Sequence, residues 1–268
     1  GPWASRPGWE QLAQATTGMQ VRRGGRNGTP ILMPYPINDY GTGILGAFAV
    51  ALAVHERNQT GLGQAVNTSL SMTACLFQSP YFLDYPGYVR NELEGPDARG
   101  YSALCRLYQS SDHWLFFNCA NEDAWAQLTK LGSFKTLGTD PRFRGSKDRI
   151  ANDKALSQLL SKTFRGKNCQ HWLATLNPAG INAAKNVTVD QFRHYQDVKD
   201  AGLIVTRHHP GIGSVDHLGN TISLSKTPVR LGRPASVIGA ETNDVLREAG
   251  YSKAAIERLQ VTGVIKQT

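Results

Sequence analysis

The sequence predicts a soluble, mixed α/β protein that combines a helical segment with a compact α+β unit. Its 268 residues suffice for a sizeable core, and 40% of them are hydrophobic while 19% are charged, as in ordinary globular proteins. Small and apolar residues surround the axis of segment 42–55 almost completely, which predicts a buried helix. Apolar, aromatic segments at 102–109 and 114–119, followed by helical periodicity, predict the α+β unit.

The first 80 residues are expected to form helices joined by turns. Residues 9–16 have the pattern of a short helix that Gly18 ends as a glycine cap. Glycines and prolines then recur through 22–36, which predicts a loop that delivers the next segment at a fixed angle. After the helix at 42–55, residues 65–70 show the alternation of a strand or the start of another helix.

Beyond Gln78 the composition changes to aromatic residues, prolines and glycines before regular elements return. The expected order is a crossing segment at 79–100, strands at 102–109 and 114–119, helices at 122–131, 154–164, 168–176 and 187–198, strand-like segments at 203–206 and 221–224, an extended tail rich in proline and glycine, and helices at 241–249 and 253–260.

Composition argues against several classes of protein. No apolar run reaches the roughly 18 to 20 residues of a membrane-spanning helix, and no targeting segment is recognisable, so no membrane association is expected. The four cysteines are widely separated and form no CxxC pair, which indicates reduced thiols in the cytoplasm. The seven histidines show no metal-ligand spacing, so no metal site is expected.

The basic charge points to anionic partners without choosing among them. A formal charge of +8 favours a nucleotide-bearing cofactor, a nucleic acid or an acidic polypeptide. The basic residues are mostly scattered and no nucleic-acid-binding motif surrounds them. Nucleic acid is therefore not an expected partner.

A glycine pattern at 41–46 imitates a nucleotide-binding turn. Gly41, Gly43 and Gly46 have the spacing G-x-G-x-x-G, which in dinucleotide-binding proteins directly follows an apolar strand. Here the preceding residues include Pro34 and Pro36, so a strand is not expected. The pattern favours a helix of small residues that packs closely against a neighbour.

Asp39 lies at a helix entrance and has two interpretations. Free backbone N–H groups and the helix dipole favour a carboxylate at that place, and its position alone favours a structural N-cap. A carboxylate that is unoccupied on one side could instead attack a carbonyl carbon. The residues themselves leave both roles open.

Several segments, taken in order, resemble the family III CoA-transferases. They are the opening segment 1–15, Asn-Asp-Tyr-Gly-Thr-Gly at 38–43, Thr-Gly-Leu-Gly-Gln at 60–64, and segments 121–125, 140–143, 177–181, 226–230 and 242–246. The resemblance implies a Rossmann-like large domain, incomplete here, with a small α+β domain, in a pair of interlocked chains. Residues 1–80 would be the large-domain part with the catalytic aspartate, 81–189 the crossing segment and small domain, and 190–268 the return to the large domain.

The resemblance also implies chemistry. Asp39 would be the nucleophile that moves CoA from an acyl-CoA to a carboxylic acid through aspartyl anhydride and aspartyl-CoA intermediates, with coenzyme A as part of the substrate and no metal. The residues expected to bind CoA or substrate are Trp9, Glu10, Gln14, Asn38, Gly41 and Gly43. The backbone N–H groups of the two glycines are expected to stabilise the oxyanion, because glycine permits close approach.

Departures from the family pattern leave alternatives. The family's N-terminal section has no counterpart here, so we expect a homodimer or an assembly with a polypeptide that supplies it. A racemase of the same superfamily would carry a histidine where this chain has Trp9, which removes half of the acid and base pair that racemisation needs. A non-catalytic, CoA-binding or structural half of a larger assembly is the third alternative.

Overall fold

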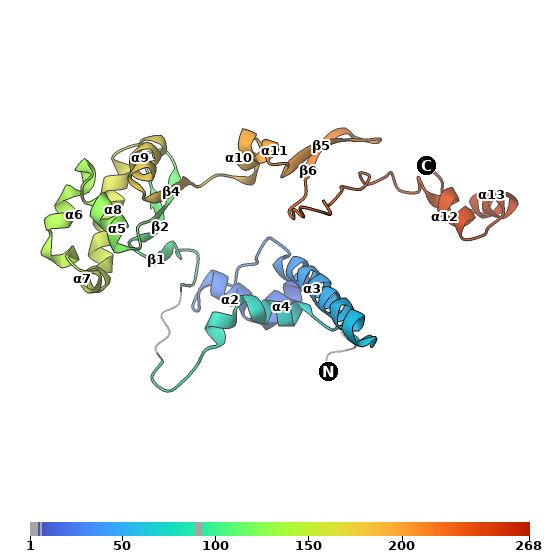
Figure 1. Cartoon of the computed structure of the whole chain (residues 1–268), viewed down its shortest axis with the longest axis horizontal. Helices are drawn as coiled ribbons and strands as arrows, with labels where there is room; N and C mark the ends of the chain where they lie inside the picture. Colours follow the sequence, from blue (N-terminus) through green and yellow to red (C-terminus); the bar gives the residue numbers. More distant parts are fainter. Residues whose placement is uncertain (1–4, 6, 89–92) are drawn as a thin grey trace. The chain divides into compact units, whose positions relative to one another are not determined.

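The structure is a computed structural model that describes residue 5 and residues 7–88 and 93–268. Residues 1–185 form one compact unit and residues 186–268 form a second. The finer division at 80/81 and 189/190 stays a prediction. Helices and sheets are mixed along the chain (Figure 1), as the expected α/β class requires.

The described part of the segment before residue 83 contains helices joined by loops. They are α1 (Glu10–Thr16), α2 (Met19–Gly24), α3 (Ile37–Thr60), α4 (Leu70–Phe77) and the short 3-10 helix η1 (Ser79–Phe82). Helix α1 matches the expected range within one residue. Gly18, with a left-handed φ of 82°, directly precedes α2, so it joins two helices where the sequence predicted one helix and a loop. The hydroxyl of Ser69 caps α4 by accepting from the backbone N–H of Met72 at 3.2 Å.

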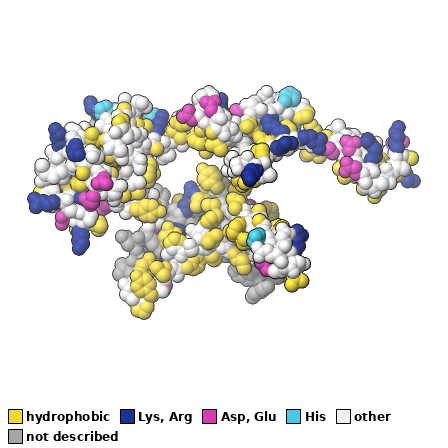
Figure 2. Space-filling view, viewed as in Figure 1, with side chains coloured by type: hydrophobic (Ala, Val, Ile, Leu, Met, Phe, Trp, Pro, Cys, Tyr) yellow, Lys and Arg dark blue, Asp and Glu magenta, His cyan; other side chains and the backbone are white. Residues whose placement is uncertain are grey.

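Helix α3 begins five residues earlier than expected, and the prediction that it is buried is wrong for this chain. Its buried residues are Asn38 and Gly41, whereas Ile44 is 70% exposed and Phe48 is 61% exposed. Figure 2 shows hydrophobic side chains at the surface of the helical segment. By length and composition alone α3 could cross a membrane, but the same properties belong to core helices. The apolar sequence of α3 predicts burial on most sides of the helix. In the described residues α1 and α4 pack against α3, and only Asn38 and Gly41 of α3 are buried.

Gly41 lets α3 and α4 approach closely. A Cβ at this position would lie 2.7 Å from Cζ of Phe77 and 2.7 Å from Cγ2 of Thr73. The hydroxyls of Thr42 and Thr73 join the same two helices by a 2.7 Å hydrogen bond. The prediction that the glycine pattern serves close packing is therefore confirmed at Gly41, and the structure has no strand between residues 29 and 36.

Two alanine substitutions two residues apart on α3 should change stability in opposite directions. Gly41→Ala is expected to lower the free energy of unfolding by about 1–3 kcal/mol, because the new methyl group clashes with Phe77 and Thr73. Gly43→Ala should raise it by about 0.5–1 kcal/mol, because its Cβ would meet no atom within 4 Å and alanine favours helix. Urea unfolding of both variants measures the difference, and equal shifts would contradict this packing.

A four-stranded antiparallel sheet organises residues 100–185. Its strands are β1 (Gly100–Ser102), β2 (Cys105–Gln109), β3 (Trp114–Asn118) and β4 (Asn182–Lys185), in the order β1-β2-β3-β4. The helices are α5 (Glu122–Leu128), α6 (Lys135–Thr139), α7 (Ser146–Ala151), α8 (Asp153–Arg165) and α9 (Cys169–Leu176), with 3-10 turns η2 (Gly132–Phe134), η3 (Pro141–Phe143) and η4 (Asn177–Ala179). The expected α+β unit is thus present, but the strand expected at 102–109 is divided into β1 and β2, which pair with each other, and β4 is an additional strand.

The main hydrophobic core lies in this unit. Helix α8 buries Leu156, Leu160 and Phe164, whose spacing of four residues places them on one helix face. The ring of Phe164 stacks on Tyr108 with centroids 4.8 Å apart and meets Trp172 edge-on at 5.2 Å. The Trp172 Nε1–H donates to the Phe164 carbonyl at 2.7 Å, so the buried indole is satisfied.

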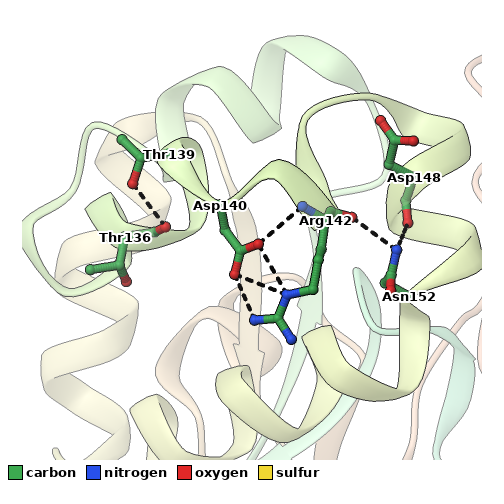
Figure 3. Close-up of polar contacts among 6 residues, drawn as sticks. All are labelled: Thr136, Thr139, Asp140, Arg142, Asp148 and Asn152. Atoms are coloured by element: carbon green, nitrogen blue, oxygen red, sulfur yellow. Dashed lines mark hydrogen bonds and ion pairs between the residues drawn. The ribbon is translucent and has the colours of Figure 1, made fainter.

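A local polar network holds the turn between α6 and α7 (Figure 3). Asp140 accepts from the backbone N–H of Arg142 at 3.0 Å and from its guanidinium at 3.0 and 2.6 Å. These hydrogen bonds hold the pKa of the Asp140 carboxyl below its usual range. Asn152 donates to the carbonyls of Arg142 and Asp148 at 3.2 and 2.9 Å. This motif, which contributed to the family resemblance, therefore has a structural role.

The second unit contains short elements and a long irregular segment. They are α10 (Val189–Arg193), α11 (Gln196–Asp200), β5 (Ile204–His209), β6 (Gly213–Leu218), α12 (Thr242–Glu248) and α13 (Lys253–Val261). Strands β5 and β6 form an antiparallel hairpin. The strand expected at 221–224 is wrong, because the partner of β5 is 213–218. The two C-terminal helices match the expected ranges within one residue at each end.

Candidate functional site

Asp39 lies inside the first turn of α3 rather than at its cap. The N-cap is Pro36, whose carbonyl accepts from the backbone N–H of Tyr40 at 3.1 Å. Asp39 is the third residue of the helix, and its side chain is exposed. The dipole of a 24-residue helix favours a negative charge at this position. The purely structural N-cap interpretation is therefore wrong, while the carboxylate stays accessible.

A buried glutamate accepts hydrogen bonds from the first turn of α3. Glu10 is 3% exposed, and its Oε2 accepts from the backbone N–H of Asp39 at 3.0 Å. Its Oε1 accepts from Nδ2 of Asn38 at 2.9 Å and from Nε2 of Gln14 at 2.8 Å. Both oxygens thus receive N–H donors, as an ionised carboxylate requires when it is removed from water. Glu10 belongs to α1, and its carboxylate accepts a hydrogen bond from a free backbone N–H of the first turn of α3, as an N-cap side chain would.

Gln14 connects this cluster to the loop rich in glycine and proline. Its Nε2 donates to the carbonyl of Met33 at 3.3 Å, and its Oε1 accepts from the Met33 backbone N–H at 3.0 Å. The loop is also held where the N–H of Ile31 donates to the carbonyl of Gln20 at 3.0 Å. The expected delivery of Asp39 at a fixed angle therefore has a physical basis in these bonds.

Four of the predicted site residues thus lie together. Glu10, Gln14, Asn38 and Asp39 form one hydrogen-bonded cluster, in which the first three side chains are buried. Contact of these three side chains with CoA or substrate stays a prediction. Trp9, 66% exposed, directly precedes Glu10 and stands at the surface beside the cluster.

Contrary to the expectation from the sequence, the backbone N–H groups of Gly41 and Gly43 are not placed to stabilise an oxyanion. Gly41 and Gly43 are the fifth and seventh residues of α3, beyond the turn that has free N–H groups, so their N–H groups belong to the helix's own hydrogen bonds. The expected helix start at residue 42 was the source of this error. Gly43 does border open space, so close approach of a ligand to it stays a prediction.

The sequence did not single out Thr42, Ser69 or Leu70 as site residues. Together with Trp9 they line a cavity of about 570 Å³. Thr42 follows Asp39 by three residues, which places both on the same side of α3. The spacing between Asp39 and Thr42 could have identified Thr42 from the sequence. Ser69 and Leu70 could not be identified in this way, because their position depends on the tertiary packing of α4 against α3.

The described residues contain no cluster of three His, Cys, Asp or Glu side chains that could hold a metal ion. Residues 1–4 and 6 of the opening signature lie outside the described residues, as do residues 89–92 of the crossing segment. The four cysteines are free thiols. Burial raises the pKa of Cys119 to about 12, so this thiol is a poor nucleophile.

Comparisons with known proteins agree on one family. The model of CoA-transferase family III matches residues 1–242. A mouse succinyl-CoA:glutarate CoA-transferase is 27% identical over 100% of this chain and 62% of its own length. The beta subunit of a succinyl-CoA–L-malate CoA-transferase from Chloroflexus aurantiacus is 26% identical over 92% of this chain and 62% of its own length. This chain therefore spans about three fifths of these relatives.

A solved structure has the same fold. A CAIB/BAIF family protein from Brucella suis superposes with a TM-score of 0.75 and 22% identity, covering 92% of this chain and 64% of that protein. Because the identity is low, this likeness concerns the fold alone. It agrees with the mixed α/β architecture expected from the resemblance.

Proposed function

The chain belongs to CoA-transferase family III, and from that premise we propose that it transfers CoA from an acyl-CoA to a carboxylic acid with Asp39 as the covalent nucleophile. One observation carries the proposal. An accessible carboxylate stands in the first turn of α3, and its backbone N–H is fixed by a buried glutamate at 3.0 Å. A nucleophile needs this combination of access and fixed position.

The proposed reaction consists of four exchanges at carbonyl carbons. An oxygen of Asp39 attacks the thioester carbon, the C–S bond breaks, and CoA leaves as a thiolate from a mixed anhydride. The thiolate attacks the aspartyl carbonyl and releases the first acid as a carboxylate. The incoming carboxylate attacks the aspartyl-CoA thioester and expels the thiolate again. Attack of that thiolate on the new acyl carbonyl then gives the new acyl-CoA and restores Asp39, with no net change in protons or oxidation state.

The chain's own residues support these steps by position and charge. The first turn of α3 offers its dipole to the developing negative charge. Glu10 is buried and acts through the backbone of Asp39 rather than on the thioester. The hydrogen-bond donors that stabilise the oxyanion would be groups other than the N–H groups of Gly41 and Gly43. Those two N–H groups are used in the backbone hydrogen bonds of α3.

We also propose an assembly in the cytoplasm. Exposed apolar residues on α3, such as Ile44 and Phe48, favour burial against further polypeptide, either a second copy of this chain or a chain that supplies the rest of the fold. The relative from Chloroflexus is described as a beta subunit, which supports an assembly of chains. Free thiols suit a reducing compartment.

Trapping of the intermediate tests the proposed nucleophile. An active preparation of the protein is incubated with acyl-CoA and then with hydroxylamine, which cleaves anhydrides and thioesters but leaves a resting carboxylate intact. Mass spectrometry of the peptides should find the hydroxamate at Asp39 only when acyl-CoA is present. Incubation with free CoA is the control. Transfer activity with the hydroxamate on another residue would reject Asp39 and keep the transferase assignment.

The alternatives have weaker support. The compared relatives are described as transferases, and Trp9 occupies the place of the histidine that a racemase would need. For a non-catalytic half of an assembly, the helix dipole would account for the charge of Asp39 but not for its fixed position above the buried Glu10. Absence of both transfer and trapping in the complete assembly would favour that third alternative.

A further inference from the structure

A cavity of about 570 Å³ lies within the helical segment, between the start of α1, the first turns of α3 and the start of α4. Trp9 and Leu12 contribute one wall, Thr42 another, and Leu70 a third. Its volume is in the range of ordinary small-molecule sites. The three helices that form it pack on one another, so the cavity belongs to one packed group of elements.

Two residues of the cavity wall, Thr42 and Trp9, are near the proposed nucleophile or its supporting residue along the chain. Thr42 lies one turn beyond Asp39 on the same side of α3. Trp9 directly precedes Glu10, whose carboxylate holds the backbone of Asp39 at 3.0 Å. A chain attached to the carboxylate of Asp39 that runs along this side of α3 therefore reaches Thr42, which lines the cavity.

The lining is apolar or hydroxylic. The described residues of its wall are Pro7, Gly8, Trp9, Leu12, Ala13, Thr16, Thr42, Thr68, Ser69, Leu70 and Ser71. None of these described residues is charged. Three of the hydroxyls already have partners in the protein: Thr16 donates to the Leu12 carbonyl at 2.8 Å, Thr42 is bonded to Thr73, and Ser69 accepts from the Met72 N–H.

These properties discriminate between acyl groups. An uncharged hydrocarbon chain gains by leaving water for the surfaces of Trp9, Leu12 and Leu70. A second carboxylate at the end of the chain would leave water without a cationic partner in the described wall, which is unfavourable. The cavity therefore matches a monocarboxylic acyl group better than a dicarboxylic one.

We propose that this cavity receives the acyl chain while it is bound to Asp39 or CoA, and that it selects uncharged aliphatic acyl groups. This inference rests on the proposed transferase function and specifies its substrate class. It distinguishes this chain from the relatives described as acting on glutarate or malate, whose acids carry a second carboxylate.

A pair of thioesters with equal chain length tests the selection. Butyryl-CoA and succinyl-CoA both carry four-carbon acyl groups and differ in a terminal methyl against a terminal carboxylate. An active preparation of the protein should use butyryl-CoA with at least tenfold higher kcat/KM than succinyl-CoA. Calorimetry of both thioesters with the Asp39→Asn variant gives the same comparison for binding without turnover.

A charge placed in the wall should change this preference. Leu12 is 51% exposed, so Leu12→Arg is compatible with the fold and sets a cation at the cavity. The variant should shift the ratio of the two kcat/KM values at least tenfold toward succinyl-CoA, mostly through KM. Ile150→Arg, at a position 74% exposed on α7, adds the same charge far from the cavity in sequence and should leave the ratio unchanged.

The outcomes separate this inference from the proposed function. Equal or better use of succinyl-CoA by the unmodified protein overturns the apolar acyl site and leaves the transferase assignment intact. An unchanged ratio in a folded Leu12→Arg variant also overturns it. Loss of the function itself has a different signature, in which neither thioester supports transfer and hydroxylamine traps nothing at Asp39.

Discussion

Asp39→Asn is expected to abolish CoA transfer and leave the fold nearly unchanged. The amide cannot form the anhydride, so turnover should fall by at least about 10³-fold, as for other lost nucleophiles. Asparagine at the third position of α3 removes one favourable charge from the helix start, which costs only about 0.3–1 kcal/mol. The loss of activity therefore exceeds the loss of stability by a wide margin.

The measurement compares turnover with thermal unfolding in an active preparation of the protein. Asp123→Asn makes the same charge change at an exposed position in the first turn of α5 and should keep full activity. An Asp39→Asn variant with unchanged turnover would end the nucleophile assignment. Equal losses of activity in both variants would indicate a general charge effect.

The elements that the sequence predicted well depend on local pattern. The spacing of Leu156, Leu160 and Phe164 makes α8 amphipathic whatever surrounds it, and the observed helix agrees with the prediction within one residue at each end. Strand β3 was predicted from a run of bulky apolar residues at 114–119, and it ends one residue earlier. In these cases local preference and tertiary packing agree.

The sequence-based predictions are wrong where contacts between residues distant in the sequence determine the local structure. Strand β4 consists of Asn-Ala-Ala-Lys, residues with low strand preference, and it forms because it pairs with β3. The predicted loop ended at Pro36, but the start of α3 was placed at residue 42, where the run of small and apolar residues begins, rather than at Ile37. A proline just before a helix is compatible with its first turn.

The resemblance named the residues of the candidate site, but their geometry could not be predicted from the sequence. The resemblance named Asp39 and Glu10, but a hydrogen bond between residues 29 positions apart leaves no local pattern. The same holds for Asn38, which is fully buried although its neighbour Asp39 is exposed. Burial of these side chains follows from the packing of α1 against α3, which the periodicity of one helix does not encode.

Glu10→Gln should lower both stability and turnover, and turnover more than substrate affinity. Three N–H donors, from Gln14, Asn38 and the backbone of Asp39, share the two oxygens of Glu10. A glutamine offers one oxygen, and its amide group faces at least one of these donors. Leaving a buried donor unsatisfied costs about 1–3 kcal/mol.

The effect on catalysis follows from position. Without its hydrogen bond to Glu10, the backbone of Asp39 is free to shift, and a displacement near 1 Å can cost about 10²-fold in rate. We therefore expect kcat to fall by about 10- to 100-fold while KM changes little, because Glu10 is 3% exposed and acts through Asp39. Direct contact of Glu10 with CoA, the role implied by the resemblance, would instead raise KM.

The rate of hydroxylamine trapping at Asp39 separates positioning from mere stability. Glu10→Gln should slow formation of the hydroxamate in proportion to kcat at a temperature where the variant is folded. Leu128→Ala, which removes a fully buried side chain from the α+β core, should cost about 2–5 kcal/mol and leave the trapping rate unchanged below its unfolding temperature. If Glu10→Gln trapped the intermediate as fast as the unmodified protein, the buried carboxylate would have no part in orienting Asp39.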